Sequence, residues 1–324
     1  MKPAISVCIP VYNVEKYIHA CIMSVLEQTF QDFEIIVVND STQDTSMHIV
    51  ESIAANDQRI KIYNNPENLG LMYTRRQGYI HANGEYVFFL DSDDTLPRNA
   101  LWNLYYAITQ KNCDVVCGQI VYITSTGTSL DKYPNILNYG NDSNAAMKST
   151  LRWEITHNLC GKIFKREILQ SYHYRTFEQV VNAEDAILFY QVLSNVKSIY
   201  VIPNVVYNYY LYDDSSTNVE LGFKALNGIF LWQKVRYEII NNAYPTLLED
   251  MYVSMISYLT GLAPSLNSRR LINGYLQKYQ IPFQVNFKNI VKYTPKKKIP
   301  KSIISYYLSG LVKKIRYYRL QHEK

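Results

Sequence analysis

The chain has 324 residues, and its 48% hydrophobic content is enough to bury the core of a globular protein. The formal charge of +5 is unevenly spread, because residues 251–322 hold thirteen Lys and Arg but no Asp or Glu, which leaves residues 1–250 net negative. No run reaches the ~18 apolar residues of a membrane-spanning helix, and residues 5–10 are too short for a signal-peptide core, so we expect neither.

The cysteines and histidines do not have the spacing of metal ligands. The five cysteines form no Cys-x-x-Cys pair and the six histidines are scattered, which argues against a zinc site and predicts reduced, mostly buried thiols. Neither Gly-x-Gly-x-x-Gly nor Gly-x-x-x-x-Gly-Lys occurs, so dinucleotide cofactors and P-loop chemistry are not expected.

Short apolar runs alternate with helical patterns over the first hundred or so residues, which predicts an α/β domain with a mostly parallel sheet. The expected strands are residues 5–9, 34–38, 59–63 and 86–90. The expected helices are residues 15–28, a segment that begins after Asp44 as its N-cap, and residues 71–82.

Beyond residue 94 the patterns predict a helix over 98–110, a strand over 114–122, a polar loop and a mixed region, with Tyr-rich helices from about 221. Three lysines at 296–298, set between two prolines, indicate a linker. We therefore expect a catalytic domain over 1–220, whose halves divide near 110, a helical extension over 221–294, and a basic linker and helix over 295–324.

Polar residues follow three of the expected strands. They are Pro10-Val11-Tyr12, Asn39-Asp40 and Asp91-Ser92-Asp93-Asp94. Ligands of open α/β sheets bind outside the carboxyl ends of the strands, so these segments should meet in one crevice.

The acidic cluster that begins at Asp91 has two interpretations. One is a loop and helix cap, because Leu96-Pro97 follows it. The other is a cation site: on an extended segment Asp91 and Asp93 point the same way, and one or two carboxylates hold the Mg²⁺ or Mn²⁺ that neutralises a diphosphate. A cluster placed after a buried strand would repel itself without a cation, which favours the second interpretation.

Several segments of the first hundred residues match a known family in order. They are ISVCIPVYN at 5–13, SVLEQTF at 24–30, DFEIIVVND at 32–40, NLG at 68–70, GEY at 84–86 and FLDSDD at 89–94. This set resembles the opening of glycosyltransferase family 2, the inverting GT-A group. The resemblance implies a Rossmann-like nucleotide-binding sheet with flanking helices, and metal-dependent transfer from a nucleotide sugar, expected to be a UDP-sugar, to an acceptor sugar hydroxyl.

The resemblance also implies roles for residues on the nucleotide side of the crevice. Val11 and Tyr12, with Pro10 before them, would flank the base. Asp40 would hydrogen-bond the base, and Arg75 would border the donor pocket.

In the acidic cluster the resemblance places Asp91 on the ribose and Asp93 on Mn²⁺ or Mg²⁺. Asp91 is also counted as a second metal ligand, and Ser92 as part of the nucleotide-sugar site. Asp94 would support these residues without touching the donor.

The pair Glu184-Asp185 resembles the family's acidic pair at the start of a helix under the acceptor site, which makes Asp185 the expected general base and Glu184 its reserve. The alternative is that these carboxylates only stabilise a helix N-terminus.

Two further segments resemble parts of the family that approach the diphosphate. One contains Lys162 and Lys165, of which Lys162 is the predicted contact and a surface role is the alternative. The other, residues 209–217, contains Ser215 and Ser216, and it lacks the basic residue that the family often has there.

Residues 304–319 place apolar side chains at spacings of three and four among four basic residues, which predicts an amphipathic basic helix. Residues 301–319 can lie on an anionic membrane, pack on the acidic body of the chain, or contact a second copy in a homodimer. We expect a cytoplasmic protein with peripheral contact to the inner face of the membrane and no nucleic-acid partner, because the donor crevice is acidic. A lipid-linked sugar acceptor fits this position.

The predicted function is sugar transfer in the synthesis of a cell-surface polysaccharide or glycoconjugate. A non-catalytic GT-A-like subunit that assists a partner transferase is the alternative, but the joint presence of Asp40, Asp91, Asp93 and Asp185 favours an enzyme. A nucleotidyltransferase would be expected to show a Gly- and Arg/Lys-rich phosphate loop near the N-terminus, and none is present.

Overall fold

A computed structural model describes residues 2–130, 138–140, 142–178, 180, 182–212, 223–266, 269–283 and 289. The chain forms two compact units, Met1–Trp232 and Gln233–Lys324. The boundary lies inside helix α8 (Phe223–Ala243), later in the chain than the division expected near residue 220.

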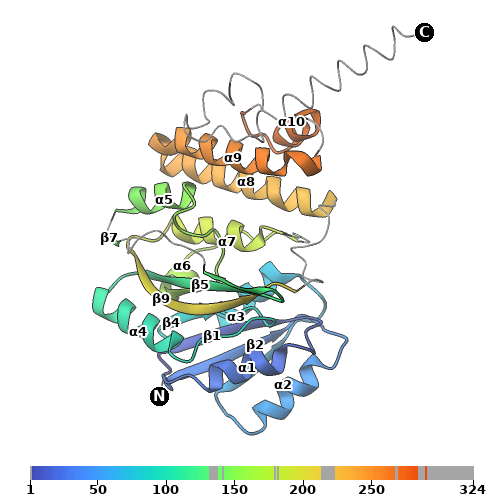
Figure 1. Ribbon diagram of the computed structural model, residues 1–324, viewed down its shortest axis with the longest axis vertical. Helices are drawn as coiled ribbons and strands as arrows, with labels where there is room; N and C mark the ends of the chain where they lie inside the picture. The colour runs from blue at the N-terminus through green and yellow to red at the C-terminus, as the bar shows by residue number, and fades with distance from the viewer. Residues whose placement is uncertain are drawn as a thin grey trace, which may run out of the picture. The chain divides into compact units, whose positions relative to one another are not determined.

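The first half of the sheet is parallel, with the order β3-β2-β1-β4 (Figure 1). Its strands are β1 (Ile5–Val11), β2 (Phe33–Asn39), β3 (Ile60–Asn64) and β4 (Tyr86–Phe89). The connecting helices are α1 (Ile18–Leu26), α2 (Ser46–Ala54) and α3 (Leu71–His81). Every strand predicted here is confirmed, three of them to within one residue at each end, while β1 extends two residues beyond its predicted end. The predicted N-cap is one residue early, although the Asp44 carboxylate does accept from the first helical amide, Ser46 N, at 3.1 Å.

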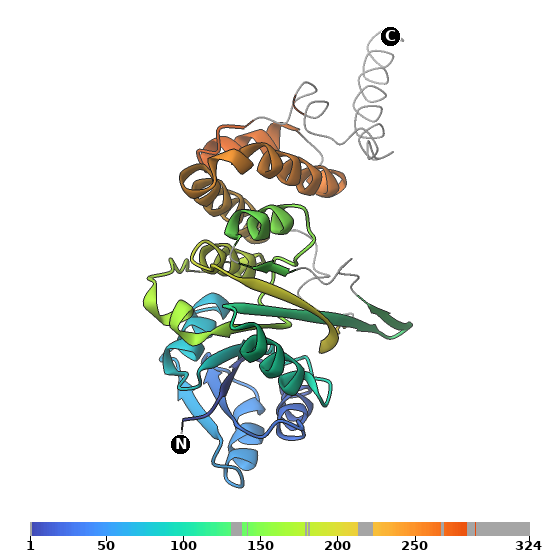
Figure 2. The same ribbon diagram turned by 90° about the vertical axis from the view of Figure 1, so that its left-hand side faces the viewer.

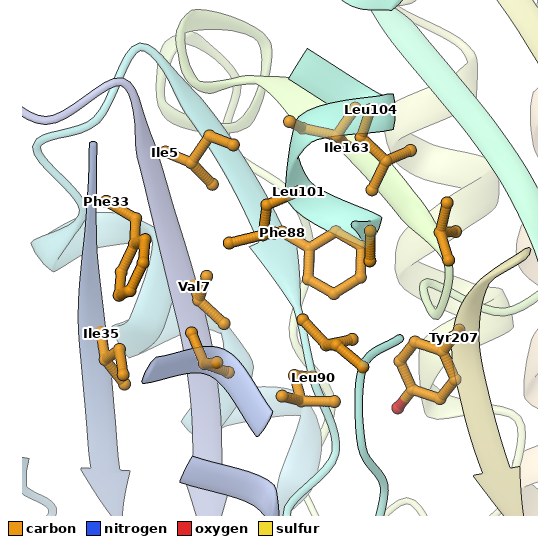
Figure 3. Packing of buried hydrophobic residues seen from close by; sticks show 14 of the residues in the cluster. Ile5, Val7, Phe33, Ile35, Phe88, Leu90, Leu101, Leu104, Ile163 and Tyr207 are labelled. Atoms are coloured by element: carbon orange, nitrogen blue, oxygen red, sulfur yellow. The ribbon is translucent and has the colours of Figure 1, made fainter. Parts of the chain in front are cut away.

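The two faces of these strands bury different side chains, because successive residues of a strand point to opposite sides. One face packs against helix α4 (Ala100–Lys111) in a single apolar cluster. Its members include Ile5 and Val7 of β1, Phe33 and Ile35 of β2, Phe88 of β4, and Leu101 and Leu104 of α4 (Figure 3). Helices α1 and α2 add Ile22 and Val50 to this layer. Helix α3 contacts β1 and β2 and places Gly78 next to Cys8, a residue of the other face.

The second half of the sheet is mixed and lies beyond the first hundred residues, for which the mostly parallel sheet was predicted. Strand β8 (Lys162–Lys165) lies antiparallel between β4 and β5 (Val115–Thr124), and β9 (Ile199–Tyr210) runs parallel to β5. Two short strands, β6 (Gly127–Leu130) and β7 (Asn138–Gly140), pair antiparallel with β5 and β9. Strand β8 thus places a later segment of the chain directly beside β4.

Helices cover both sides of the second half as well. The helices are α4, α5 (Ser143–Leu151), α6 (Arg166–Ser171) and α7 (Glu184–Leu193). Helices α4 and α7 lie on opposite sides of β5 and β9 in both views (Figures 1 and 2). All five cysteines are free and buried, as predicted from their spacing.

The second unit is helical where it is described, as the Tyr-rich pattern predicted. It contains the end of α8, a 3-10 turn at Pro245–Leu247, α9 (Leu248–Leu266) and α10 (Arg269–Lys278). Ile240, Met251 and Ile272 form part of its buried interior. No helix in the described ranges is long and apolar enough to cross a bilayer. The predicted linker at 295–300 and basic helix at 301–319 lie outside the described residues.

Candidate active site

Polar residues gather at the carboxyl ends of the parallel strands. Strand β1 ends at Val11, β2 at Asn39 and β4 at Phe89, so the chain leaves all three strands at the same edge of the sheet. The site is therefore built on strand ends in the crevice where open α/β sheets bind ligands.

Residues 91–94, called the acidic turn below, close on themselves. The amide of Asp94 donates to the carbonyl of Asp91 at 3.1 Å, so the segment is a hydrogen-bonded turn and not the extended segment that the sequence predicted. Asp91 and Asp93 are partly exposed, whereas Ser92 and Asp94 are buried. The turn thus presents two carboxylates to the crevice and directs the third into the protein.

Arg75 of α3 connects the acidic turn to helix α7. Its Nη2 donates to Asp91 Oδ1 at 2.7 Å and its Nη1 to Glu184 Oε1 at 3.1 Å, while only 3% of the side chain is exposed. The Nε of Arg75 is buried and has no hydrogen-bond partner among the described residues. Burial disfavours the charged guanidinium, but the carboxylates of Asp91 and Glu184 outweigh it and raise the pKa of Arg75. The two acidic segments are therefore joined through one buried cation.

Cys160 is a site residue that the sequence did not reveal. Its Sγ donates to Asp91 Oδ2 at 3.2 Å, so both carboxylate oxygens of Asp91 have protein partners. Burial, followed by the charge of Asp91, raises the pKa of the Cys160 thiol, which keeps it protonated as a donor. Its position just before Gly161-Lys162 carries no signal of this contact.

Asp93 fits the ligand of a divalent cation. Within the described part of the chain its carboxylate forms no salt bridge, in contrast to that of Asp91. Burial and then repulsion by Asp91 raise the pKa of Asp93 to about 6. A nearby dication would relieve both effects, and Mg²⁺ and Mn²⁺ commonly take one or two carboxylates and complete their shells with water and phosphate.

Asp94 is hydrogen-bonded to two residues of strand β9. Its Oδ2 accepts from Tyr207 Oη and its Oδ1 from Tyr210 N, both at 2.8 Å. Burial, together with the charges of Asp93 and Asp91, raises the pKa of Asp94 to about 9.

Glu184 and Asp185 occupy the first turn of α7, as the sequence predicted. The helix follows two residues with left-handed backbone conformations, Asn182 (φ 64°) and Ala183 (φ 69°). This conformation is rare for residues other than glycine, and when it occurs it is often at a functional site. Burial, and then the charge of Glu184, raises the pKa of Asp185 to about 7, although Arg75 opposes the shift. A carboxyl that titrates near neutral pH is suited to proton transfer.

Asp40, predicted to bind the nucleotide base, holds a loop in this structure. Its carboxylate accepts from Asn65 Nδ2 at 2.7 Å and from the amides of Leu69 and Gly70 at 2.9 Å. Gly70 has φ 86°, a conformation that glycine adopts without strain, and the chain enters α3 directly after it. Asp40 therefore fixes the start of the helix that carries Arg75.

We expect Asp40→Asn to lower the free energy of unfolding by about 1–3 kcal/mol, because one of the buried donors around the carboxylate loses its acceptor. Chemical denaturation followed by circular dichroism measures this. Asp32→Asn is the matched control, since Asp32 is exposed. Equal stability of the two variants would contradict the loop-holding role.

The other predicted nucleotide contacts differ in exposure. The side chains of Pro10 and Val11 are buried, and Val11 belongs to the core cluster. Tyr12 is 45% exposed and is followed by Asn13 with φ 54°. Of these three residues, Tyr12 alone presents a large side chain to solvent.

Of the predicted diphosphate contacts, Lys162 alone lies among the described residues. Lys162 is only 1% exposed, and its Nζ donates to Thr156 Oγ1 at 2.7 Å and to Asn158 Oδ1 at 3.0 Å. A phosphate contact would require the lysine to exchange these acceptors. Ser215 and Ser216 lie outside the described residues.

A parallel half, a mixed half beside it, and an acidic turn at the end of β4 together are the features of the GT-A class of fold. A protein-family model described as Glycosyl transferase family 2 matches residues 6–172, about half of the chain. The chain belongs to this family.

Curated relatives agree with this assignment. Glycosyltransferase GlyG of Streptococcus pneumoniae is 36% identical over 118 residues, which are 36% of this chain and 39% of that protein. Cholesterol galactosyltransferase of Borreliella burgdorferi is 28% identical over 216 residues, 64% of this chain and 60% of that protein. The chain thus spans less than two thirds of the length of these curated relatives.

The crystal structure of S. aureus TarS 1-349 in complex with UDP-GlcNAc has a similar fold. It superposes with a TM-score of 0.66 at 22% identity, over 89% of this chain and 78% of that one. At this identity the likeness concerns the fold.

Proposed function

We propose that the protein is an inverting, metal-dependent glycosyltransferase that moves a sugar from a UDP-sugar to a hydroxyl of an acceptor sugar. The observation that carries the proposal is the joining of two acidic pairs, Asp91 with Asp93 and Glu184 with Asp185, around the buried Arg75 at the carboxyl edge of the sheet. One pair suits a donor with its cation, and the other suits an acceptor proton.

In this proposal Asp93, with Asp91 beside it, would hold Mn²⁺ or Mg²⁺. Such an ion supplies charge neutralisation for the departing nucleoside diphosphate. Arg75 fixes the orientation of Asp91 from within the protein, and its charge lies beside the cluster that would receive the anionic donor. These residues bind and orient the donor.

Asp185 would accept the proton of the acceptor hydroxyl as that oxygen attacks the anomeric carbon. Attack from the face opposite the leaving diphosphate inverts the anomeric configuration in a single displacement, with no covalent enzyme intermediate. The salt bridge from Arg75 to Glu184 supports this role, since it ties the start of α7 to the donor side.

Two of the similar proteins bear on the choice of donor and acceptor. The UDP-GlcNAc complex of TarS supports a uridine nucleotide, for which Tyr12 offers an exposed ring. The name of the Borreliella relative describes transfer to a lipid, in line with a lipid-linked acceptor at the cytoplasmic face of the membrane. Contact through residues 301–319 and a role in polysaccharide or glycoconjugate synthesis belong to the same proposal.

The test is a panel of nucleotide sugars incubated with the full-length protein and Mn²⁺ or Mg²⁺, with release of the nucleoside diphosphate as readout. We expect hydrolysis of one donor class that stops when EDTA is added. A well-folded chain that turns over no donor would favour the alternative, a non-catalytic subunit of a partner transferase.

A further inference from the structure

The end of strand β9 runs along the acidic turn. Thr95, the residue after the turn, forms an antiparallel bridge with Asn208, with N···O distances of 3.0 and 3.3 Å. The amide of Tyr210 donates to Asp94, and Tyr212 Oη donates to the carbonyl of Asp93 at 3.5 Å. Because β9 lies more than a hundred residues later in the chain, the turn is held from outside its own half of the sheet.

Tyr207 is the innermost of these contacts. Its side chain is fully buried, and its ring lies 6.3 Å from that of Phe88 within the apolar cluster (Figure 3). Its hydroxyl accepts from the amide of Asp91 at 3.1 Å and donates to Asp94 Oδ2 at 2.8 Å. A single buried oxygen thus connects the two ends of the acidic turn.

We propose that Tyr207 is a positioning residue whose hydroxyl fixes the backbone of the acidic turn, so that Asp91 and Asp93 are held in the geometry that binds the donor and its cation. The inference rests on the proposed function for the identity of that ligand. It follows from the hydrogen-bond balance, because removal of the hydroxyl leaves the Asp91 amide and one Asp94 oxygen without this partner in a buried place. Binding geometry must be held to within about 0.5 Å, so a relaxed turn weakens the site.

The first variant is Tyr207→Phe, which keeps the ring in the core and removes only the hydroxyl. Tyr86→Phe is the matched control: Tyr86 is buried in the same apolar cluster, its ring packs on Tyr105, and it begins β4, at the opposite end of that strand from the acidic turn. We expect UDP affinity measured calorimetrically in the presence of Mn²⁺ to fall by about 10-fold in Tyr207→Phe and to stay unchanged in Tyr86→Phe. Unchanged UDP affinity in a folded Tyr207→Phe would overturn the inference.

Amide hydrogen exchange at Asp91 gives a readout that needs no ligand. We expect faster exchange in Tyr207→Phe than in the wild type, because the amide loses its acceptor. If Tyr207→Phe does not fold, Asp94→Ala tests the same contact from the other side, because it removes the acceptor that fixes the Tyr207 hydroxyl, and should also raise exchange at Asp91. Unchanged exchange in the folded variant overturns the inference.

The two proposals fail in different ways. A wild-type chain that binds no UDP with either cation would contradict the proposed function. Exchange at Asp91 would then decide by itself whether Tyr207 holds the turn.

Discussion

Asp93→Asn is expected to reduce metal-dependent sugar transfer by about 10³-fold, a loss on the order of 4 kcal/mol in transition-state stabilisation. The amide keeps the shape of the side chain but loses the negative charge that a dication needs. Asp91 is a poor substitute, because Arg75 and Cys160 already occupy its two carboxylate oxygens. Initial rates over a range of Mn²⁺ concentrations, with the donor found in the nucleotide-sugar panel, measure the effect.

The control for this prediction is Asp32→Asn, which removes an exposed carboxylate of the same type that follows no strand of the parallel half. Its rate and its Mn²⁺ dependence should match the wild type. Removal of the Asp93 charge should raise the free energy of unfolding near neutral pH, because burial and repulsion by Asp91 disfavour the charged carboxylate in the folded protein. A folded Asp93→Asn variant that keeps more than a tenth of the wild-type rate would show that Asp93 is not a metal ligand.

The parallel half of the fold could be predicted from the sequence because its strands are buried on both faces. Such strands appear as continuous apolar runs, and β2 and β4 are of this kind. Strand β9 was missed because Pro203, Asn204 and Asn208 interrupt it, residues that are rare inside strands. Its pairing with β5 is correspondingly irregular between Cys117 and Ile120. Local composition therefore concealed the element that holds the acidic turn.

The same limit applies to the candidate site: patterns of neighbouring residues could be recognised in the sequence, whereas contacts between distant segments could not. The acidic cluster and the pair at the start of α7 were identifiable because each lies within a short, ordered pattern. The partners of Asp91 could not be predicted, since Arg75 and Cys160 come from segments 16 and 69 residues away. The loop-holding contacts of Asp40 were hidden for another reason: two of its three donors are backbone amides, which have no sequence signature.

Arg75 couples the electrostatics of the acidic turn to those of the pair Glu184-Asp185. It is the buried cation that contacts both Asp91 and Glu184, so the charge on one acidic segment affects the other. Among the groups that act on Asp185, Glu184 raises its pKa and Arg75 lowers it. The protonation of Asp185 therefore depends on neighbours that can be changed one at a time.

Transfer should lose rate as the pH falls through about 7. A raised pKa means that Asp185 takes up its proton at a higher pH than an ordinary aspartate, and a protonated carboxyl cannot accept the acceptor's proton. Below this pH the value of kcat/KM should fall about tenfold per pH unit. Asp185→Asn should lose about 10²–10⁴-fold at pH 8 and show no such fall, while UDP affinity is retained.

Glu184→Gln tests whether the loss of rate at low pH comes from protonation of Asp185 or from an unspecific loss of activity in acid. It removes the charge that raises the pKa of Asp185, so the pH at which kcat/KM falls should move to a lower value, with activity retained above it. If Glu184 were the base instead, Glu184→Gln would abolish transfer at every pH and Asp185→Asn would not. A pH profile that is the same in Glu184→Gln and the wild type would show that the titrating group lies outside this pair, because the two carboxylates belong to consecutive residues and the charge of Glu184 acts on Asp185.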